Sequence, residues 1–160
     1  MPGTIAHELQ QTKPFSSPEE EVLLGLLTAA ARAGEPWAGF LKATSELTSN
    51  QYNVLRILRG SHPDRLACSD VASRMIDRDP DVTRLIDRLE TRGLVQRVRS
   101  STDRRVVEVG ITAKGRKLVG SLDAAARQMP KALLEHLGPA RLRQLARLLD
   151  AVTSGLGTFP

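Results

Sequence analysis

The stretch VTRLIDRLETRGLVQRVRSSTDRRVVEVGIT, residues 82–112, decides the fold that we expect for this chain. In its first half, four apolar residues recur at the helical spacing i, i+3, i+4 and i+7: Val82, Leu85, Ile86 and Leu89. This spacing predicts a helix with one buried stripe, and Gly93 is placed to end it. Beyond the glycine, apolar and charged residues alternate over 94–99 and 105–111, on either side of the turn SSTDR. The alternation predicts a two-stranded hairpin.

The opposite face of this helix is polar and partly basic, and it carries Asp81, Thr83, Arg84, Asp87, Arg88 and Arg92. Asp79 is the expected N-cap, and Pro80 the first helical residue. A short helix, a tight turn, a basic helix and a hairpin together are typical of a winged helix-turn-helix. In that architecture the basic helix enters the major groove of DNA. The hairpin, or wing, reaches the neighbouring backbone or minor groove, whose negative potential attracts arginine.

Helical segments precede this stretch. Ser17 and Glu20 predict a capped helix start, and that helix should be kinked or broken at Gly34–Pro36 before it continues to about Glu46. Thr48 and Gln51 form a second expected capping box, for a helix that Gly60 would end. A short third helix is expected over CSDVASRMI, with three residues facing inward: Val71, Ala72 and Met75.

Two helical regions follow the hairpin. The first is expected to run from Thr112 toward His136, with a bend or an interruption at Pro130. The second begins at Pro139 and places four apolar residues on one face: Leu142, Leu145, Leu149 and Val152. The fold class is therefore mainly α with a small β-hairpin wing. Both terminal helical regions carry more apolar surface than a small domain needs, so that surface should face a partner.

Composition restricts the class of protein. With 160 residues, 41% of them apolar and 26% charged, the chain has the composition of a globular protein. The apolar runs are too short to cross a membrane, and the N-terminus lacks the pattern of a secretory signal. A single cysteine, Cys68, excludes an intrachain disulfide and is typical of a reducing compartment. These features predict a cytoplasmic protein that does not associate with membranes.

Positive charge is concentrated in the middle of the chain. Residues 51–117 hold fifteen Lys and Arg against nine acidic residues, for a net charge of +6, whereas residues 1–50 have a net charge of −3. A basic region of this kind favours a polyanionic partner.

The central region also resembles the MarR family of bacterial transcriptional regulators. The phrase LETRGLV, residues 89–95, is similar to the end of that family's recognition helix. Asp103 and Arg105 match its Asp-x-Arg wing element, and Ile111, Thr112 and Gly115 match the Leu-Thr-x-x-Gly that follows. The close resemblance extends from about Leu47 to Lys117.

The resemblance implies a homodimer that binds a pseudo-palindromic double-stranded operator, usually as a repressor. It implies a helical dimerisation layer over 17–47 with 113–160 and a winged DNA-binding domain over 48–112, while residues 1–16 show no periodicity and are expected to form a loose N-terminal arm. It also implies that a small aromatic or anionic effector enters a crevice between the two layers. Four residues are expected to line that crevice, although core packing explains the first three equally well: Trp37, Phe40, Tyr52 and Arg56.

The residues expected to bind DNA lie on the basic helix and on the wing: Thr83, Arg84, Arg88, Ser100, Asp103, Arg104 and Arg105. Arg105 would enter the minor groove, and Asp103 would hold it by a charge-assisted hydrogen bond. Four further basic residues either contact phosphate or form a solvated charged face: Arg92, Arg97, Arg116 and Lys117. Asp81 departs from the family pattern, and it either satisfies the helix dipole or accepts a hydrogen bond from cytosine.

Other functions have less support. His7, His62 and His136 lack the close spacing of a zinc site, and Cys68 is not placed like the N-terminal cysteine of the peroxide-sensing branch. We expect no cofactor. The sequence contains no phosphate-binding glycine loop and no paired nucleophile and base, so we expect no enzyme. The alternative is a winged-helix module that binds DNA without sequence preference or mediates protein–protein contacts.

Overall fold

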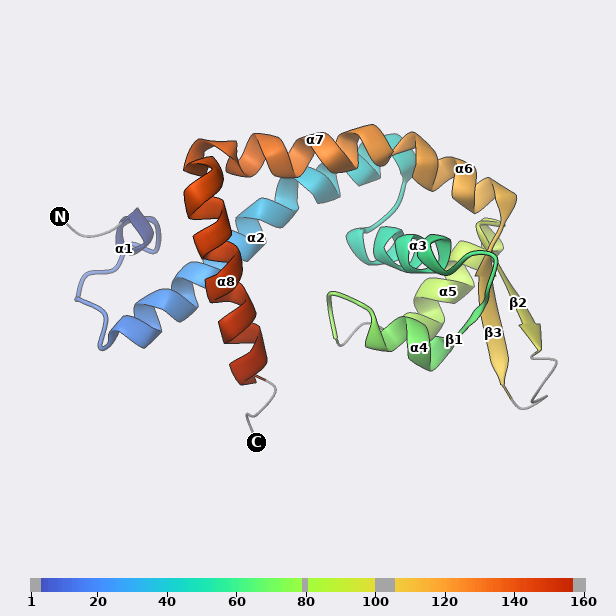
Figure 1. The fold of residues 1–160 in the computed structure, drawn as a ribbon, viewed down its shortest axis with the longest axis horizontal. Helices are drawn as coiled ribbons and strands as arrows, with labels where there is room; N and C mark the ends of the chain where they lie inside the picture. The colour runs from blue at the N-terminus through green and yellow to red at the C-terminus, as the bar shows by residue number, and fades with distance from the viewer. Residues whose placement is uncertain (1–3, 79–80, 100–105, 157–160) are drawn as a thin grey trace. The chain divides into compact units, whose positions relative to one another are not determined.

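The computed structural model describes residues 4–78, 81–99 and 106–156 (Figure 1). Its helices are α1 (Thr4–Glu8), α2 (Pro18–Ser45), α3 (Ser49–Ser61), α4 (Cys68–Ser73), α5 (Val82–Thr91), α6 (Ala113–Ser121), α7 (Asp123–Leu134), the 3-10 helix η1 (Glu135–Leu137) and α8 (Gly138–Leu156). Its strands are β1 (Leu66–Ala67), β2 (Val95–Arg99) and β3 (Val107–Ile111). The expected mainly α fold with a small wing is thus confirmed. The chain divides into two compact units, Met1–Val119 and Gly120–Pro160.

The wing belongs to an antiparallel sheet of three strands in the order β1-β3-β2. Strands β2 and β3 pair as the expected hairpin, in the register that places Val95 opposite Ile111. Strand β1 adds only two residues, with Leu66 opposite Val109. The sequence predicted two strands, because a segment as short as β1 shows no alternation and is defined only by its pairing with β3.

The core of the first unit is built against one face of α5. Val82, Ile86 and Leu89 of the predicted stripe are buried, whereas Leu85 is half-buried. Helix α5 contacts α3, α4 and β2, and Ile86 and Leu89 are fully inaccessible to solvent. The polar face of α5 is therefore left on the outside, as the periodicity predicted.

Helix α4 confirms two of its three expected core residues. Val71 and Met75 are buried, but Ala72 is exposed, so its predicted inward position is wrong. Ala72 follows Val71 directly, and adjacent residues on a helix point about 100° apart. Met75 lies beyond the end of α4, and its burial does not follow from the helical spacing alone.

The predicted helix starts are confirmed in part. At Thr48 both bonds of the capping box are present, since Gln51 N donates to the Thr48 hydroxyl and Thr48 N donates to the Gln51 amide oxygen. Ser17 caps α2 as expected, but the Glu20 carboxylate accepts from the N–H and hydroxyl of Ser16 instead of from Ser17. Helix α5 begins at Val82 with Asp81 as its N-cap, so the expected cap at Asp79 is wrong.

Prolines do not end the helices in which they lie. Helix α2 continues through Pro36, and α7 continues through Pro130, so the predicted alternative of a break is wrong at both prolines, whereas a kink or bend stays a prediction. A proline removes one backbone hydrogen bond, and the packing of the following turn can outweigh that loss. After Pro36, Trp37 makes an edge contact with Tyr52 of α3, which holds the second half of α2 in place. The break in the C-terminal region falls instead at Leu122, close to the boundary between the two units.

Two further features were not predicted. A short helix, α1, lies within the region expected to be a loose arm, and its Glu8 forms an ion pair with Arg32 of α2 at 3.3 Å. A helix of five residues is too short to show a period, which is why the sequence does not reveal it. Helix α3 continues one residue beyond Gly60, to Ser61. Among the described residues, every helix is too short or too polar to cross a bilayer.

Candidate nucleic-acid interface

Helix α5 presents three of the predicted DNA-binding side chains to solvent. Thr83, Arg84 and Arg88 are exposed, and they lie opposite the buried stripe of the same helix. The helix ends at Thr91 with Arg92 as its C-cap, and Gly93 follows at φ +68°, in the left-handed region that glycine adopts without strain. A ten-residue helix with one buried face and one exposed polar face that carries Arg84 and Arg88 has the form needed to enter a major groove.

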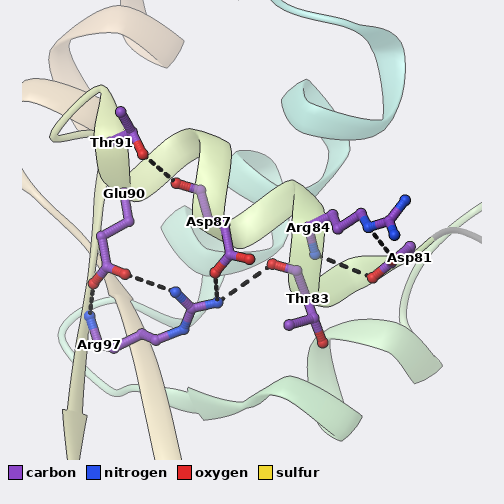
Figure 2. Close-up of polar contacts among 7 residues, drawn as sticks. All are labelled: Asp81, Thr83, Arg84, Asp87, Glu90, Thr91 and Arg97. Atoms are coloured by element: carbon purple, nitrogen blue, oxygen red, sulfur yellow. Dashed lines mark hydrogen bonds and ion pairs between the residues drawn. The ribbon is translucent and has the colours of Figure 1, made fainter.

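The N-terminus of α5 is closed by Asp81. One oxygen of its carboxylate accepts from the backbone N–H of Arg84 at 3.1 Å, and the other lies 3.1 Å from Nε of the same residue (Figure 2). Asp81 thus has the N-cap role that was expected of Asp79, and its carboxylate lies at the helix end where it favours the helix dipole, one of its two predicted alternatives. The Arg84 side chain is 78% exposed, and an ion pair at such exposure contributes only about 0–1 kcal/mol. Arg84 can therefore exchange Asp81 for a phosphate or a base at little cost.

The Arg97 side chain of β2 forms ion pairs and a hydrogen bond within the protein. Its guanidinium lies 2.6 Å from Asp87 and 2.7 Å from Glu90, and it donates to Thr83 O at 3.3 Å (Figure 2). The backbone N–H of Arg97 also donates to Glu90, at 2.9 Å. These contacts bind the wing to α5 along most of the length of the helix. The predicted alternative of a solvated charged face is therefore wrong for Arg97, whereas a phosphate contact stays a prediction.

The surroundings of Arg97 also keep it charged. Burial lowers the pKa of its guanidinium, but hydrogen bonds and charge attraction from Asp87 and Glu90 outweigh burial, so that the pKa is raised. The side chain is 24% exposed, and the two carboxylates approach it from the same helix. Asp87 and Glu90 stand three residues apart, so both carboxylates face the strand that follows. This spacing is the sequence signal that would have identified the partners of Arg97.

Arg92 likewise bonds within the protein. Its guanidinium donates to Ser45 O at 2.8 Å and to Glu46 O at 3.0 Å, both at the end of α2. The other two basic residues with open roles lie on α6. Arg116 is half-buried, with Nη1 3.5 Å from Nδ1 of His62, and Lys117 is exposed. Four of the predicted wing contacts, Ser100, Asp103, Arg104 and Arg105, lie outside the described residues.

The four residues predicted to line an effector crevice form one cluster. Trp37 stacks on Phe40 with ring centroids 5.5 Å apart, and it meets Tyr52 edge-on at 5.0 Å. The guanidinium of Arg56 lies 6.0 Å from the centre of the Tyr52 ring, at the limit of a cation–π contact. Tyr52 is buried, Trp37 and Phe40 are half-buried, and Arg56 is exposed. An aromatic platform with a cation at its edge suits a flat, anionic molecule.

A groove of about 930 Å³ lies beside α5 and was not predicted from the sequence. Its lining comes from the end of α2, the start of α3 and two residues of α5, and comprises Ala38, Lys42, Glu46, Leu47, Thr48, Ser49, Asn50, Leu85 and Arg88. The half-buried position of Leu85 is explained by this groove. Within the part of the chain that the structure describes, His, Cys, Asp and Glu side chains form no group that could hold a metal ion.

Comparison with known proteins places these features in a family. The MarR family model matches residues 47–107. A MarR transcription factor from Planctomyces limnophilus is 40% identical, with 86% of this chain and 99% of that chain covered and a TM-score of 0.63. The HTH-type transcriptional regulator FarR of Neisseria gonorrhoeae is 27% identical over 148 residues, which cover 88% of this chain and 99% of FarR.

A further solved structure is that of BpsR from Bordetella bronchiseptica, whose DNA binding is regulated by 6-hydroxynicotinic acid. It is 28% identical to this chain, covers 88% of it and 98% of its own length, and has a TM-score of 0.76. The Planctomyces relative is matched over almost its whole length at 40% identity, and the family model lies on the winged region. This chain belongs to the MarR family of DNA-binding transcriptional regulators.

Proposed function

We propose that this chain is a homodimeric regulator that reads a pseudo-palindromic operator, represses transcription there, and is released by a small aromatic or anionic ligand. The proposal rests mainly on α5, whose exposed face carries Thr83, Arg84 and Arg88 while Arg97 braces the helix from the wing. Residues 48–112 would bind DNA, with the wing contributing the predicted contacts of Arg105 and its neighbours. A helix held on its inner side can keep its outer side chains in register with base edges.

Exposed apolar residues support the homodimer. In the first unit, α2 exposes Val22, Leu23 and Leu27, each by more than half of its surface. In the second unit, α8 exposes four large apolar residues along its length: Leu148, Leu149, Val152 and Leu156. Exposed apolar surface of this extent is typical of an interface between proteins. We assign the terminal helices to the dimer, which would place two copies of α5 about one DNA turn, roughly 34 Å, apart.

The aromatic cluster supports regulation by a ligand. Trp37 and Phe40 supply stacking surface, and Arg56 supplies positive charge at the edge of Tyr52. A planar carboxylic acid matches both features, and the 6-hydroxynicotinic acid that regulates BpsR is such a molecule. A ligand that favours a spacing of the two α5 helices different from that of the operator would lower operator affinity by its differential binding.

The proposed function is tested by fluorescence anisotropy on duplexes selected from a random pool. We expect the protein to bind a selected palindrome at about physiological salt. The complex should persist in a large excess of unrelated competitor DNA, because base contacts distinguish the palindrome from the competitor. If the competitor abolishes binding to every selected duplex, the protein contacts phosphates without recognising a base sequence. The same assay, repeated with 6-hydroxynicotinic acid and related aromatic acids, tests for release.

Arg84→Ala is expected to weaken operator binding by about 10- to 100-fold, the loss that accompanies removal of one good base contact. Its side chain is 78% exposed and its partner Asp81 stays on the same helix, so the substitution leaves the core untouched. Arg32→Ala is the matched control, because Arg32 is also an exposed arginine in a surface ion pair, on α2. Anisotropy titrations of both variants with the operator test whether Arg84 contacts DNA. Equal affinities for the two variants would remove Arg84 from the interface.

A further inference from the structure

The last turn of α2 offers its carbonyl groups to a donor from another helix. Glu46 follows α2 at φ +54°, and its N–H donates back to Leu41 O. The final carbonyls of a helix have no donor within the helix, and they attract cations because the helix dipole makes that end negative. The guanidinium of Arg92 donates to two of them, Ser45 O at 2.8 Å and Glu46 O at 3.0 Å. Arg92 thus caps a helix that ends 47 residues earlier in the chain.

Arg92 is also the C-cap residue of α5. Its backbone follows the last turn of α5, and its own carbonyl oxygen accepts from Lys114 Nζ of α6 at 2.7 Å. Thr112, just before α6, donates its hydroxyl to Gly93 O at 2.8 Å. The ends of α2 and α5 and the start of α6 therefore meet at one residue, inside the first compact unit.

Helix α5 is consequently held on two sides by two arginines. Arg97 ties it to the wing through Asp87 and Glu90. Arg92 ties its C-terminal end to α2, through a bidentate, charge-assisted pair of hydrogen bonds that fixes direction as well as distance. The Arg92 residue is half-buried, and both terminal nitrogens of its guanidinium donate to carbonyl groups. It is therefore poorly placed to neutralise a phosphate.

We propose that Arg92 is a positioning residue that sets the orientation of α5 relative to α2, and thereby the spacing at which a dimer presents its two DNA-reading helices. This inference rests on the proposed function, in which α2 belongs to the dimer layer and α5 reads the operator. Its role differs from both alternatives predicted from the sequence, because Arg92 acts through other helices without touching DNA.

The proposal is tested with Arg92→Ala and Arg92→Lys on the full chain. Operator affinity is measured across a range of salt concentrations and on operators whose half-sites are moved apart or together by one base pair. We expect Arg92→Ala to weaken binding to the native spacing by about tenfold. We also expect it to reduce the preference for that spacing and to leave the salt dependence unchanged. Arg92→Lys should recover little of the operator affinity or of the spacing preference, since one ammonium cannot bond two carbonyls in the geometry of a guanidinium.

Three results would overturn the proposal. A phosphate contact would lower the salt slope by about 0.9 in Arg92→Ala, and lysine would restore affinity. A purely stabilising role would lower the melting temperature while leaving affinity and spacing preference unchanged below it. Hydrogen exchange at the Glu46 and Leu47 amides of the free protein should quicken in Arg92→Ala. Unchanged exchange there would show that the tie does not exist.

Failure of the proposed function gives a different result. In that case the wild type selects no operator, and no spacing preference is seen for any variant. The exchange measurement then decides the proposal, because it needs no DNA. Faster exchange at the Glu46 and Leu47 amides of Arg92→Ala supports the tie between Arg92 and the end of α2, and unchanged exchange overturns it. Arg84→Ala serves as the matched control, since its loss should alter DNA affinity without affecting exchange in α2.

Discussion

Gly115→Ala is expected to lower the free energy of unfolding by about 2–4 kcal/mol, because a side chain at this position has no room. A Cβ atom built on Gly115 would overlap Leu94 O and would stand 2.8 Å from Cγ1 of Ile111. Neither neighbour can yield easily. Leu94 O is a backbone atom that accepts from both Thr112 N and the Thr112 hydroxyl, each at 3.1 Å. Relief of the overlap would have to separate α6 from the start of the wing.

Gly120→Ala is the matched control in the same helix. Gly120 also lies in α6, but a Cβ there meets nothing within 4 Å. Alanine is favoured over glycine in a helix by about 1 kcal/mol, so this variant should be as stable as the wild type or slightly more stable. Urea unfolding followed by circular dichroism, at one protein concentration throughout, compares the two. Equal stability of the two variants would mean that α6 does not approach Leu94 as closely as described.

Val152→Asp is expected to convert the proposed homodimer to a monomer and to weaken operator binding by about 100-fold or more. Val152 lies among the exposed apolar residues of α8, where a carboxylate would have to be buried without a partner on association. A monomer contacts one half-site only, and the loss of a linked second site typically reduces affinity by about 10²- to 10⁴-fold. Analytical ultracentrifugation gives the association state, and anisotropy gives the operator affinity.

Ser154→Asp controls for the added charge. Ser154 stands two residues further along α8, on the side away from the apolar stripe, where its hydroxyl donates to Asp150 O. It should remain a dimer and keep its operator affinity. Circular dichroism of both variants verifies that α8 still folds. A dimer that survives Val152→Asp would place the interface elsewhere on the chain.

Local patterns predicted the elements that carry the candidate site. The stripe on α5 follows from helical spacing alone, and its exposed Thr83, Arg84 and Arg88 follow from the same period. Alternation predicted the β2–β3 hairpin. The sequence also predicted the Thr48–Gln51 capping box, because all of its atoms lie within four consecutive residues. The DNA contacts assigned to these residues remain predictions.

Partners distant in sequence were not predicted. Arg92 and Arg97 look like other basic residues of a DNA-binding region, yet the acceptors of Arg92 lie 46 and 47 residues away at the end of α2. The strand β1 exists only through its pairing with β3. Neither Pro36 nor Pro130 breaks its helix, since the local loss of one hydrogen bond does not determine how much the surrounding packing stabilises that helix.

The sequence by itself determined that this chain has a winged helix-turn-helix with an exposed basic helix, because such features depend on periods and spacings within a few turns of one helix or one hairpin. Only the tertiary structure decided which arginines remain free for a partner. Arg84 keeps a solvent-exposed side chain, whereas Arg97 and Arg92 are held by acceptors from other elements. A charged side chain has the same chemistry in both settings, and the difference lies in which acceptors the fold brings within hydrogen-bonding distance.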